Sequence, residues 1–374
     1  MIVQHPLLWC ALLLATGIVV GEYFPLPYYL PLLAVILIAC LWLRNSRHLH
    51  DILTIIVWLL IGCSRISVCH ESSREQTGGN VITRKAGEIQ ASLINRLEKS
   101  HLSPNALALC SALVLGHRDG LKRETRQAYA RAGISHLLAL SGMHLGILYG
   151  LLHLIFIRWV SHSRWRCYAL PFILSILWGY TLVVGMPVSL IRAAIMLSVF
   201  TITWLLQYKT DPLHPLALSA IIILLVSPEA LFSISFQLSF TAVFFIIAFW
   251  KPIEENFPHL PWVARMLAVS CIAQLGTTPL TLYYFHQLPL LAPIFSVILI
   301  PITTAIIYMT LIVLALPLVP LSRLINTFES VQQYIVDSID KVPGATQTGF
   351  YPDVIMVVHV YAVLLIAIVR LRTR

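Results

Sequence analysis

Long apolar runs recur along the whole chain and constrain its fold more than any other feature. Runs of roughly 18 or more mostly apolar residues are long enough to cross the hydrocarbon core of a bilayer as helices. Hydrophobic residues make up 58% of the chain and charged residues only 11%, whereas soluble domains carry about 25% charged residues. The runs are solid rather than alternating, which argues against a transmembrane barrel. The sequence therefore predicts an all-α polytopic membrane protein with about 10–12 transmembrane helices, some of them broken or re-entrant, and with amphipathic interfacial helices.

The apolar runs place ten spans and one longer block. The spans are expected at about residues 6–22, 27–43, 51–69, 134–157, 167–185, 189–206, 213–227, 231–250, 263–283 and 353–371. The first run lacks the basic start and the cleavage site of a signal peptide, so we interpret it as a retained span. The block 289–318 is too long for one straight span and contains Pro301. We expect two half-helices there, or a re-entrant pair, hinged near Pro301.

Short basic loops orient these spans, because loops rich in lysine and arginine face the cytoplasm. Residues 44–50, residues 158–166 and the tail 370–374 are basic. If all three face the cytoplasm, the spans alternate without conflict and residues 70–132 lie outside. The sequence thus predicts a multi-pass protein of the cell membrane.

Three parts follow from this arrangement of spans. Residues 1–70 form an N-terminal three-helix membrane segment, residues 71–132 an extracytoplasmic linker with amphipathic helices, and residues 133–374 the main transmembrane domain. The basic residues of the second part are interpreted as solvated helix faces. The alternative is a collar that attracts a phosphate backbone.

A further amphipathic helix is expected within the last of these parts. Apolar residues keep helical spacing from 321 to 342. Polar residues, Glu329 and Gln332 among them, occupy the other positions. This pattern predicts a helix that lies on the outer surface.

Polar residues inside the apolar runs are the candidates for function, because they are costly at membrane depth unless they face protein or water. Residues 133–146 read GISHLLALSGMHLG. We expect the Ser141–Gly142 step to break the helix, since glycine lowers helix propensity by about 1 kcal/mol relative to alanine. The candidates for lining a channel are Ser135, His136, Ser141, Gly142, His144, Arg192, Gln237, Ser239 and Gln274.

Each candidate has a structural interpretation beside the functional one. Close packing, with histidines bonded to neighbouring helices, explains residues 133–146 as well as a cavity lining does. Arg192 either snorkels to the interface or supplies a fixed cation, suited to phosphate, at a pore entrance. Gln237 and Gln274 lie in polar stripes that interhelical hydrogen bonds explain as well as a lumen does.

The sequence matches no motif of an enzyme or a metal site. It contains no GxSxG, no Walker loop and no HExxH. His136 and His144 are eight residues apart, about 80° around a helix, whereas paired metal ligands on one helix usually sit three or four apart. The cysteines show no CxxC spacing, and Cys69 with Cys110 is the one pair considered for an extracytoplasmic disulfide. We expect no catalytic residue, no cofactor and no metal site.

The sequence resembles the ComEC competence-protein family over roughly residues 105–345. The blocks that carry the resemblance occur in the same order as in the family: ALVLGHRDGL (112–121), GISHLLALSGMHLGIL (133–148), GMPVSLIRAAIM (185–196), SPEALFSISFQLSFTAV (227–243), AQLGTTPLTLYYFHQLP (273–289) and ILIP (298–301). Family members often carry an extracellular OB-like domain and a metallo-β-lactamase-like nuclease domain. The resemblance is therefore to a short form without these two domains, and Ser296 stands where the family has asparagine.

The resemblance implies an inner-membrane channel subunit that conducts single-stranded DNA into the cytoplasm during natural transformation. The implied partners are single-stranded DNA, the lipid bilayer, a cytoplasmic ATP-driven motor or helicase and an extracytoplasmic DNA receptor. A separate nuclease and homo-oligomerisation stay open. The alternative function is a secondary transporter or flippase for a smaller anion on the same scaffold. An intramembrane enzyme that uses His136 and His144 is disfavoured.

Overall fold

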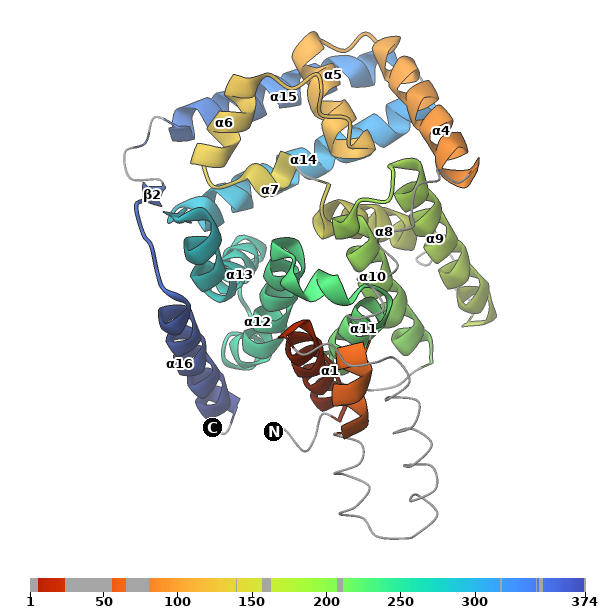
Figure 1. Ribbon diagram of the computed structural model, residues 1–374. Helices are drawn as coiled ribbons and strands as arrows, with labels where there is room; N and C mark the ends of the chain where they lie inside the picture. The colour runs from red at the N-terminus through yellow and green to blue at the C-terminus, as the bar shows by residue number, and fades with distance from the viewer. Residues whose placement is uncertain are drawn as a thin grey trace. The chain divides into compact units, whose positions relative to one another are not determined.

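Helices make up almost all of the described part of the chain (Figure 1). The computed structural model describes residues 6–23, 56–64, 81–138, 140–156, 163–206, 211–316, 318–340, 342 and 346–372. Besides a helix at residues 56–64, the elements are α1 (Pro6–Tyr23), α4 (Val81–Glu98), α5 (Pro104–Cys110), the π-helix η2 (Ser111–Leu115), α6 (Arg123–Arg131), α7 (Ser135–Leu138), α8 (Gly142–Phe156), α9 (Ser163–Val183), α10 (Val188–Leu205), α11 (Leu213–Val226), the 3₁₀-helix η3 (Pro228–Phe232), α12 (Ile234–Asn256), α13 (Trp262–Phe285), β1 (Gln287–Leu288), α14 (Ala292–Ala315), α15 (Val319–Asp340), β2 (Gln347–Thr348) and α16 (Val354–Arg372). The all-α prediction is confirmed.

Five of the described helices are long and apolar enough to cross a membrane, namely α1, α10, α12, α13 and α14. Shorter apolar helical segments lie in α5 with η2, in α8, in α9, in α11 and in α16. The predicted span 27–43 and most of the span 51–69 lie outside the described residues. The chain is a polytopic membrane protein, as predicted.

Contacts divide the chain into two compact units. One comprises residues 1–78 and 198–244, and the other residues 79–197 and 245–374, so the boundaries fall within α10 and α12. In the first unit α1 packs along α11. The predicted domain boundaries at residues 70 and 132 stay predictions.

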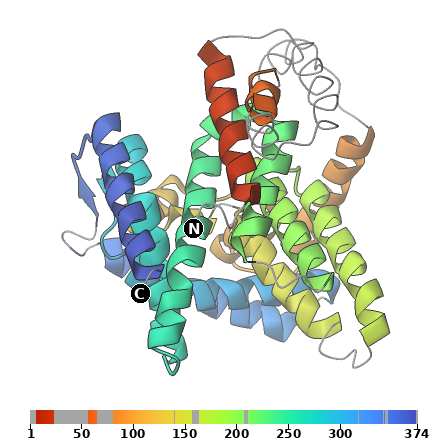
Figure 2. The same ribbon diagram turned by 90° about the horizontal axis from the view of Figure 1, so that it is seen from below.

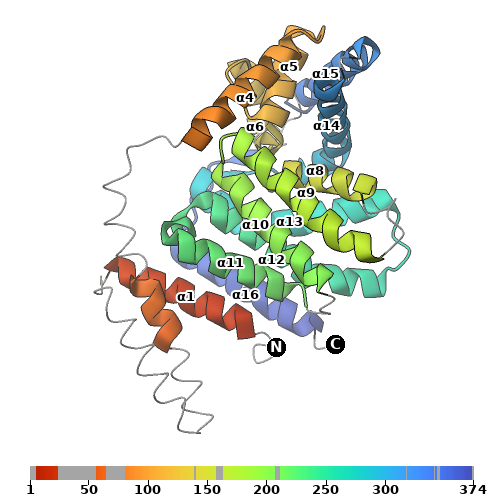
Figure 3. The ribbon, with the colours of Figure 1, turned by 90° about the vertical axis from the view of Figure 1, so that its right-hand side faces the viewer.

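The core of the second unit lies where α14 packs beside α15 (Figures 1 and 3). Helices α4, α5 and α6 and the π-helix η2 pack around this pair. Their buried apolar residues form one cluster. Within it, Gln332 of α15 donates hydrogen bonds to Tyr129 Oη of α6 at 2.9 Å and to Thr303 Oγ1 of α14 at 3.2 Å. The two bonds link α15 to α6 and α14 through the amide nitrogen of Gln332, whereas its Oε1 is buried without a hydrogen-bond partner among the described residues.

The last helix of the chain, α16, packs on α13 (Figures 1 and 2). Tyr361 Oη of α16 donates a hydrogen bond to the carbonyl of Gly276 in α13 at 2.9 Å. The short strands β1 and β2 pair antiparallel, with Gln287 opposite Thr348. This ladder ties the segment before α16 to the end of α13.

The prediction of two half-helices or a re-entrant pair hinged near Pro301 is wrong, because these residues form the single helix α14. Two other prolines set its limits: Pro293 lies in the first turn, where a missing N–H costs nothing, and the helix ends at Ala315, before Pro317. Pro301 itself is accommodated inside the helix. Packing against α13 and α15 holds the helix together across it, as happens for prolines in membrane helices.

The amphipathic helix at 321–342 forms as α15, but its polar residues do not all face outward. Glu329 is 7% exposed and Gln332 is fully buried, because α6 and α14 cover this face of the helix. Leu324 and Val331, which keep the apolar spacing, are exposed. The periodicity therefore located the helix correctly and its buried face only in part.

Cys110 is a free and fully buried thiol. Cys69, the other member of the pair considered for a disulfide, lies outside the described residues. Thr310 Oγ1 donates a hydrogen bond to Cys110 Sγ at 3.2 Å. Burial raises the pKa of Cys110 to about 12. The thiol is therefore an inert part of the core at neutral pH.

Candidate functional site

A break between α7 and α8 positions the candidate site. Helix α7 ends at Leu138 and α8 begins at Gly142, and Leu140 and Ser141 between them are not helical. The predicted interruption at the Ser141–Gly142 step is confirmed. The carbonyl of Ser141 accepts a hydrogen bond from the backbone N–H of His144 at 3.1 Å, so Ser141 occupies the N-cap position of α8.

His144 turns back over the break and bonds to Ser141. Its Nδ1 accepts a hydrogen bond from the backbone N–H of Ser141 at 3.3 Å, and Ser141 Oγ lies 3.1 Å from the same atom. This is the reciprocal bond of a capping box, with an imidazole in place of the usual carboxylate. Because a backbone N–H only donates, Nδ1 carries no proton and the neutral ring holds its proton on Nε2. His144 is 2% exposed, and its Nε2 has no hydrogen-bond partner among the described residues.

Gly142 brings the start of α8 against α10. A Cβ at this position would lie 3.2 Å from the Cβ of Ala193, so a side chain here would push the two helices apart. Arg192, the neighbour of Ala193, is buried and only 4% exposed. A snorkelling arginine keeps its charged end in water, so this position fits the interpretation of Arg192 as a fixed cation inside the protein.

Apolar packing holds the break in place. Leu140 packs with Val184 and Leu190, which flank the turn between α9 and α10. Gly116, at the end of η2, has φ of 73°, and a Cβ there would lie 2.5 Å from Leu140 Cδ1. Only glycine combines this left-handed backbone with the close approach.

The π-helix η2 supports the same junction. Tyr180 Oη donates a hydrogen bond to the carbonyl of Val114, and Gln90 Nε2 donates to the carbonyl of Leu115, both at 2.7 Å. These bonds satisfy carbonyls at the end of the π-turn, a conformation that is frequent at functional sites. Sequence reasoning did not identify Tyr180 or Gln90. The available signal was Gly116, directly after an apolar run.

Two further basic side chains lie near the break. His136 of α7 and Arg118, which follows η2, are both exposed and close enough to His144 to interact with it electrostatically. Ser135 is exposed as well. The structure thus brings Ser141, Gly142 and His144 together at the break, with Arg192 on the neighbouring helix α10. His144 and Arg192 are buried, whereas Gly142 is exposed. Sequence reasoning interpreted Arg118 as part of a solvated basic face, because no local pattern links it to His144.

The three remaining candidates donate hydrogen bonds to backbone carbonyls. Gln237 Nε2 donates to the carbonyl of Leu231 at 3.0 Å, and Ser239 Oγ donates to the carbonyl of Ser235 at 2.8 Å. These residues belong to the first unit. Gln274 Nε2, in the second unit, donates to the carbonyl of Pro289 at 2.6 Å.

Gln274 thereby supports the loop on which the segment before α7 rests. Gly133 has φ of 72°, and a Cβ there would overlap the ring of Pro289. Gly133 is therefore a glycine for two reasons, its left-handed backbone and its contact with the proline. The role of Gln274 seen here is to position Pro289.

The described residues contain no group of three or more His, Cys, Asp or Glu side chains that would hold a metal ion. The chemistry of the break is that of hydrogen-bond donors and cations: the Nε2–H of His144, the guanidinium of Arg192 and, nearby, Arg118 and His136. Such a set recognises anions.

A family model and several individual proteins are similar in sequence to this chain. The sequence model of a family described as "Competence protein" matches residues 113–374. The chain is 34% identical over 205 residues to ComE operon protein 3 of Bacillus subtilis, covering 55% of this chain and 26% of that protein. It is 24% identical over 234 residues to Recombination protein 2 of Haemophilus influenzae, covering 57% and 30%, and 29% identical over 191 residues to an uncharacterized protein of Mycoplasma pneumoniae, covering 46% and 48%. The matches thus span between a quarter and a half of these relatives, and no solved structure matches the chain.

Proposed function

Because this chain belongs to the competence protein family, we propose that it is an inner-membrane channel subunit that conducts single-stranded DNA into the cytoplasm during natural transformation. The observation that carries the proposal is the buried His144, whose Nε2–H has no acceptor in the part of the chain that the structure describes. It lies in a broken membrane-type helix that packs on α10 beside the buried Arg192. Broken backbone at this depth is found where it lines a cavity or is buried in protein.

The substrate explains why these particular groups are needed. A nucleic-acid strand carries one negative charge per nucleotide, and hydrocarbon rejects each charge. A neutral imidazole N–H and a guanidinium are both donors that fit phosphate oxygens. One cation and one neutral donor hold a phosphate weakly enough to release it, and conduction requires such weak sites.

The partners follow from the same proposal. Threading a polyanion inward needs external work, which we assign to a cytoplasmic ATP-driven motor or helicase. An extracytoplasmic receptor delivers the DNA. The chain itself acts as a conduit without catalysis, alone or as a homo-oligomer.

One observation favours the second candidate, a carrier or flippase for a smaller anion. Gln237, Ser239 and Gln274 donate hydrogen bonds to backbone carbonyls. Three of the predicted channel-lining groups are thus engaged within the chain, which suits a local site for a small anion as well as a path for a strand. The two functions differ in the size of what passes.

Uptake by proteoliposomes of the purified full chain separates the two functions. We expect a labelled single-stranded oligonucleotide to enter under an imposed membrane potential, and Arg192→Ala to abolish its entry while Arg323→Ala, at an exposed site on α15, leaves entry unchanged. Entry of inorganic phosphate with exclusion of the oligonucleotide would establish the carrier instead. In cells, loss of the protein should leave surface-bound DNA outside, and normal DNA entry in such cells would refute both the channel and its site.

A further inference from the structure

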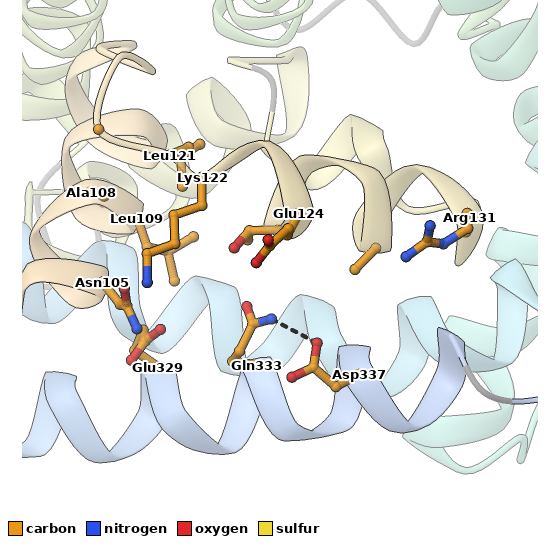
Figure 4. A pocket seen from close by; sticks show the side chains of 13 residues that line it. Asn105, Ala108, Leu109, Leu121, Lys122, Glu124, Arg131, Glu329, Gln333 and Asp337 are labelled. Atoms are coloured by element: carbon orange, nitrogen blue, oxygen red, sulfur yellow. Dashed lines mark hydrogen bonds between the residues drawn. The ribbon is translucent and has the colours of Figure 1, made fainter.

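A pocket of about 280 Å³ lies between α5, α6 and α15 (Figure 4). It shares no residue with the site at the α7–α8 break. Glu329, Gln333 and Asp337 line it from one face of α15, since residues four apart share a helix face. From the side of α6 it is lined by Lys122, Glu124, Thr125 and Arg131.

Glu329 is the buried member of this lining. It is 7% exposed, and its carboxylate faces the pocket beside Asn105 (Figure 4). No other described residue donates a hydrogen bond to it or forms an ion pair with it. Burial raises the pKa of the Glu329 carboxyl, as expected for an acid without a cationic partner. A buried carboxylate of this kind is stabilised when a ligand brings the missing cation.

The pocket carries charges of both signs. Its acids are Glu124, Glu329 and Asp337, and its bases are Lys122 and Arg131. A purely cationic ligand would be repelled by the two bases, and a purely anionic ligand by the three acids. A ligand that carries an ammonium group and an anionic group a short distance apart meets complementary charge at both ends.

We propose that this pocket binds an aminoethyl phosphate group, with the ammonium at Glu329 and the phosphate at Lys122, which lies at the same end of the pocket (Figure 4). A primary ammonium has N–H donors that form charge-assisted hydrogen bonds with a carboxylate, and basic side chains are the usual ligands of phosphate. The proposal concerns ligand recognition outside the break and is independent of the proposed conduction of DNA.

The surroundings of the pocket favour a membrane lipid as the source of this group. Helix α15 exposes apolar side chains, Leu324, Val331 and Tyr334 among them. Exposed apolar residues on an amphipathic helix are typical of a helix that lies in the membrane interface. Aminoethyl phosphate is the headgroup of phosphatidylethanolamine, and free aminoethyl phosphate is a soluble source of the same chemistry.

Native mass spectrometry of the full chain in detergent tests the proposal. The protein is offered equal amounts of phosphatidylethanolamine and phosphatidylcholine with identical acyl chains, because phosphatidylcholine carries the same phosphate but no N–H donor. We expect the ethanolamine lipid to be retained about tenfold in excess, and Glu329→Gln to bring the ratio to about one, since charge-assisted hydrogen bonds are lost. The matched control, Glu88→Gln at an exposed acid of α4, should keep the wild-type ratio.

Further measurements distinguish the lipid from free aminoethyl phosphate as the ligand and control for a misfolded variant. Lys122→Gln, at an exposed position, should lower retention of both lipids because the phosphate loses a ligand. Displacement of the lipid by free aminoethyl phosphate would show that either source fills the pocket, whereas resistance to it would assign the pocket to lipid. With the wild-type protein alone, stepwise N-methylation of the headgroup should reduce retention step by step. Equal retention of both lipids by the wild type, or an excess that survives Glu329→Gln, would overturn the proposal.

Discussion

Nδ1 of His144 lies 3.3 Å from the backbone nitrogen of Ser141 and accepts its hydrogen bond across the break between α7 and α8. The bond closes the first turn of α8 and at the same time determines which ring nitrogen carries the proton. The side chain of His144 therefore caps α8 at the break and also determines that the buried Nε2 carries the N–H donor. Both functions depend on the break, because an uninterrupted helix would use the N–H of Ser141 itself.

The first prediction separates the two roles of His144. His144→Ala removes both the cap and the donor, and should lower transformation frequency about tenfold, the effect of losing roughly 1–1.5 kcal/mol. His144→Gln should retain most of the frequency, because glutamine at this position completes a capping box and still offers an N–H. The measurement is transformation frequency at equal membrane levels of each variant. Equal loss in both variants would show that the imidazole itself is needed.

The second prediction concerns the buried cation. Arg192→Ala should reduce transformation about a hundredfold, since a desolvated charge-assisted contact is worth roughly 1.5–3 kcal/mol. Arg192→Lys should restore only part of it, because an ammonium lacks the forked donors of a guanidinium. Arg323→Ala, at an exposed arginine of α15, serves as the matched control. Normal transformation by a membrane-localised Arg192→Ala protein would show that Arg192 is not part of the conduction path.

The third prediction tests the backbone that supports the break. Gly133→Ala should destabilise the protein by about 1–3 kcal/mol, the cost of a strained left-handed residue, and more where the new Cβ overlaps Pro289. Gly146→Ala is the control, because a Cβ there meets nothing within 4 Å and alanine favours the helix by about 1 kcal/mol. Thermal unfolding of the detergent-purified proteins measures both. A Gly133→Ala protein as stable as Gly146→Ala would contradict the contact with Pro289.

The fourth prediction concerns the pH dependence of stability. Burial raises the pKa of Glu329 in the folded protein, so the folded state binds more protons than the unfolded state above about pH 4. The stability linked to this proton is complete below the unfolded pKa and is lost as pH rises through the folded pKa. In lipid-free detergent, Glu329→Gln should flatten this decline, whereas Glu88→Gln should follow the wild type. Melting temperatures across pH provide the comparison, and parallel curves for Glu329→Gln and the wild type would contradict it.

The helices were predictable from the sequence wherever a local signal marks their ends. The apolar block at 292–315 shows both the strength and the limit of this reasoning. Pro293 and Pro317 flank the helix as local rules require, but Pro301 lies inside it, because neighbouring helices support the chain where the local hydrogen bond is missing.

The candidate site was predictable in part for the same reason. The step at Ser141 and Gly142 is a local signal, and the helix breaks there. Gln237 and Gln274 resemble His144 in sequence, because all three are polar residues within apolar runs. Both glutamines, however, donate hydrogen bonds to backbone carbonyls. A hydrogen-bond partner is a property of the packed structure, so periodicity does not distinguish a supporting residue from a buried donor such as His144 Nε2, which has no partner among the described residues.

The sequence by itself determined that the chain is helical and lies in a membrane, where most of its helices begin and end, and that one of them breaks before Gly142. These features depend on run length, glycine and proline, which act within a few residues of where they stand. Only the tertiary structure decided that His144 and Arg192 are buried beside one break and that Glu329 faces a pocket without a partner. Burial and partnership are set by which helices pack on which face, and that choice depends on contacts between residues far apart in the chain.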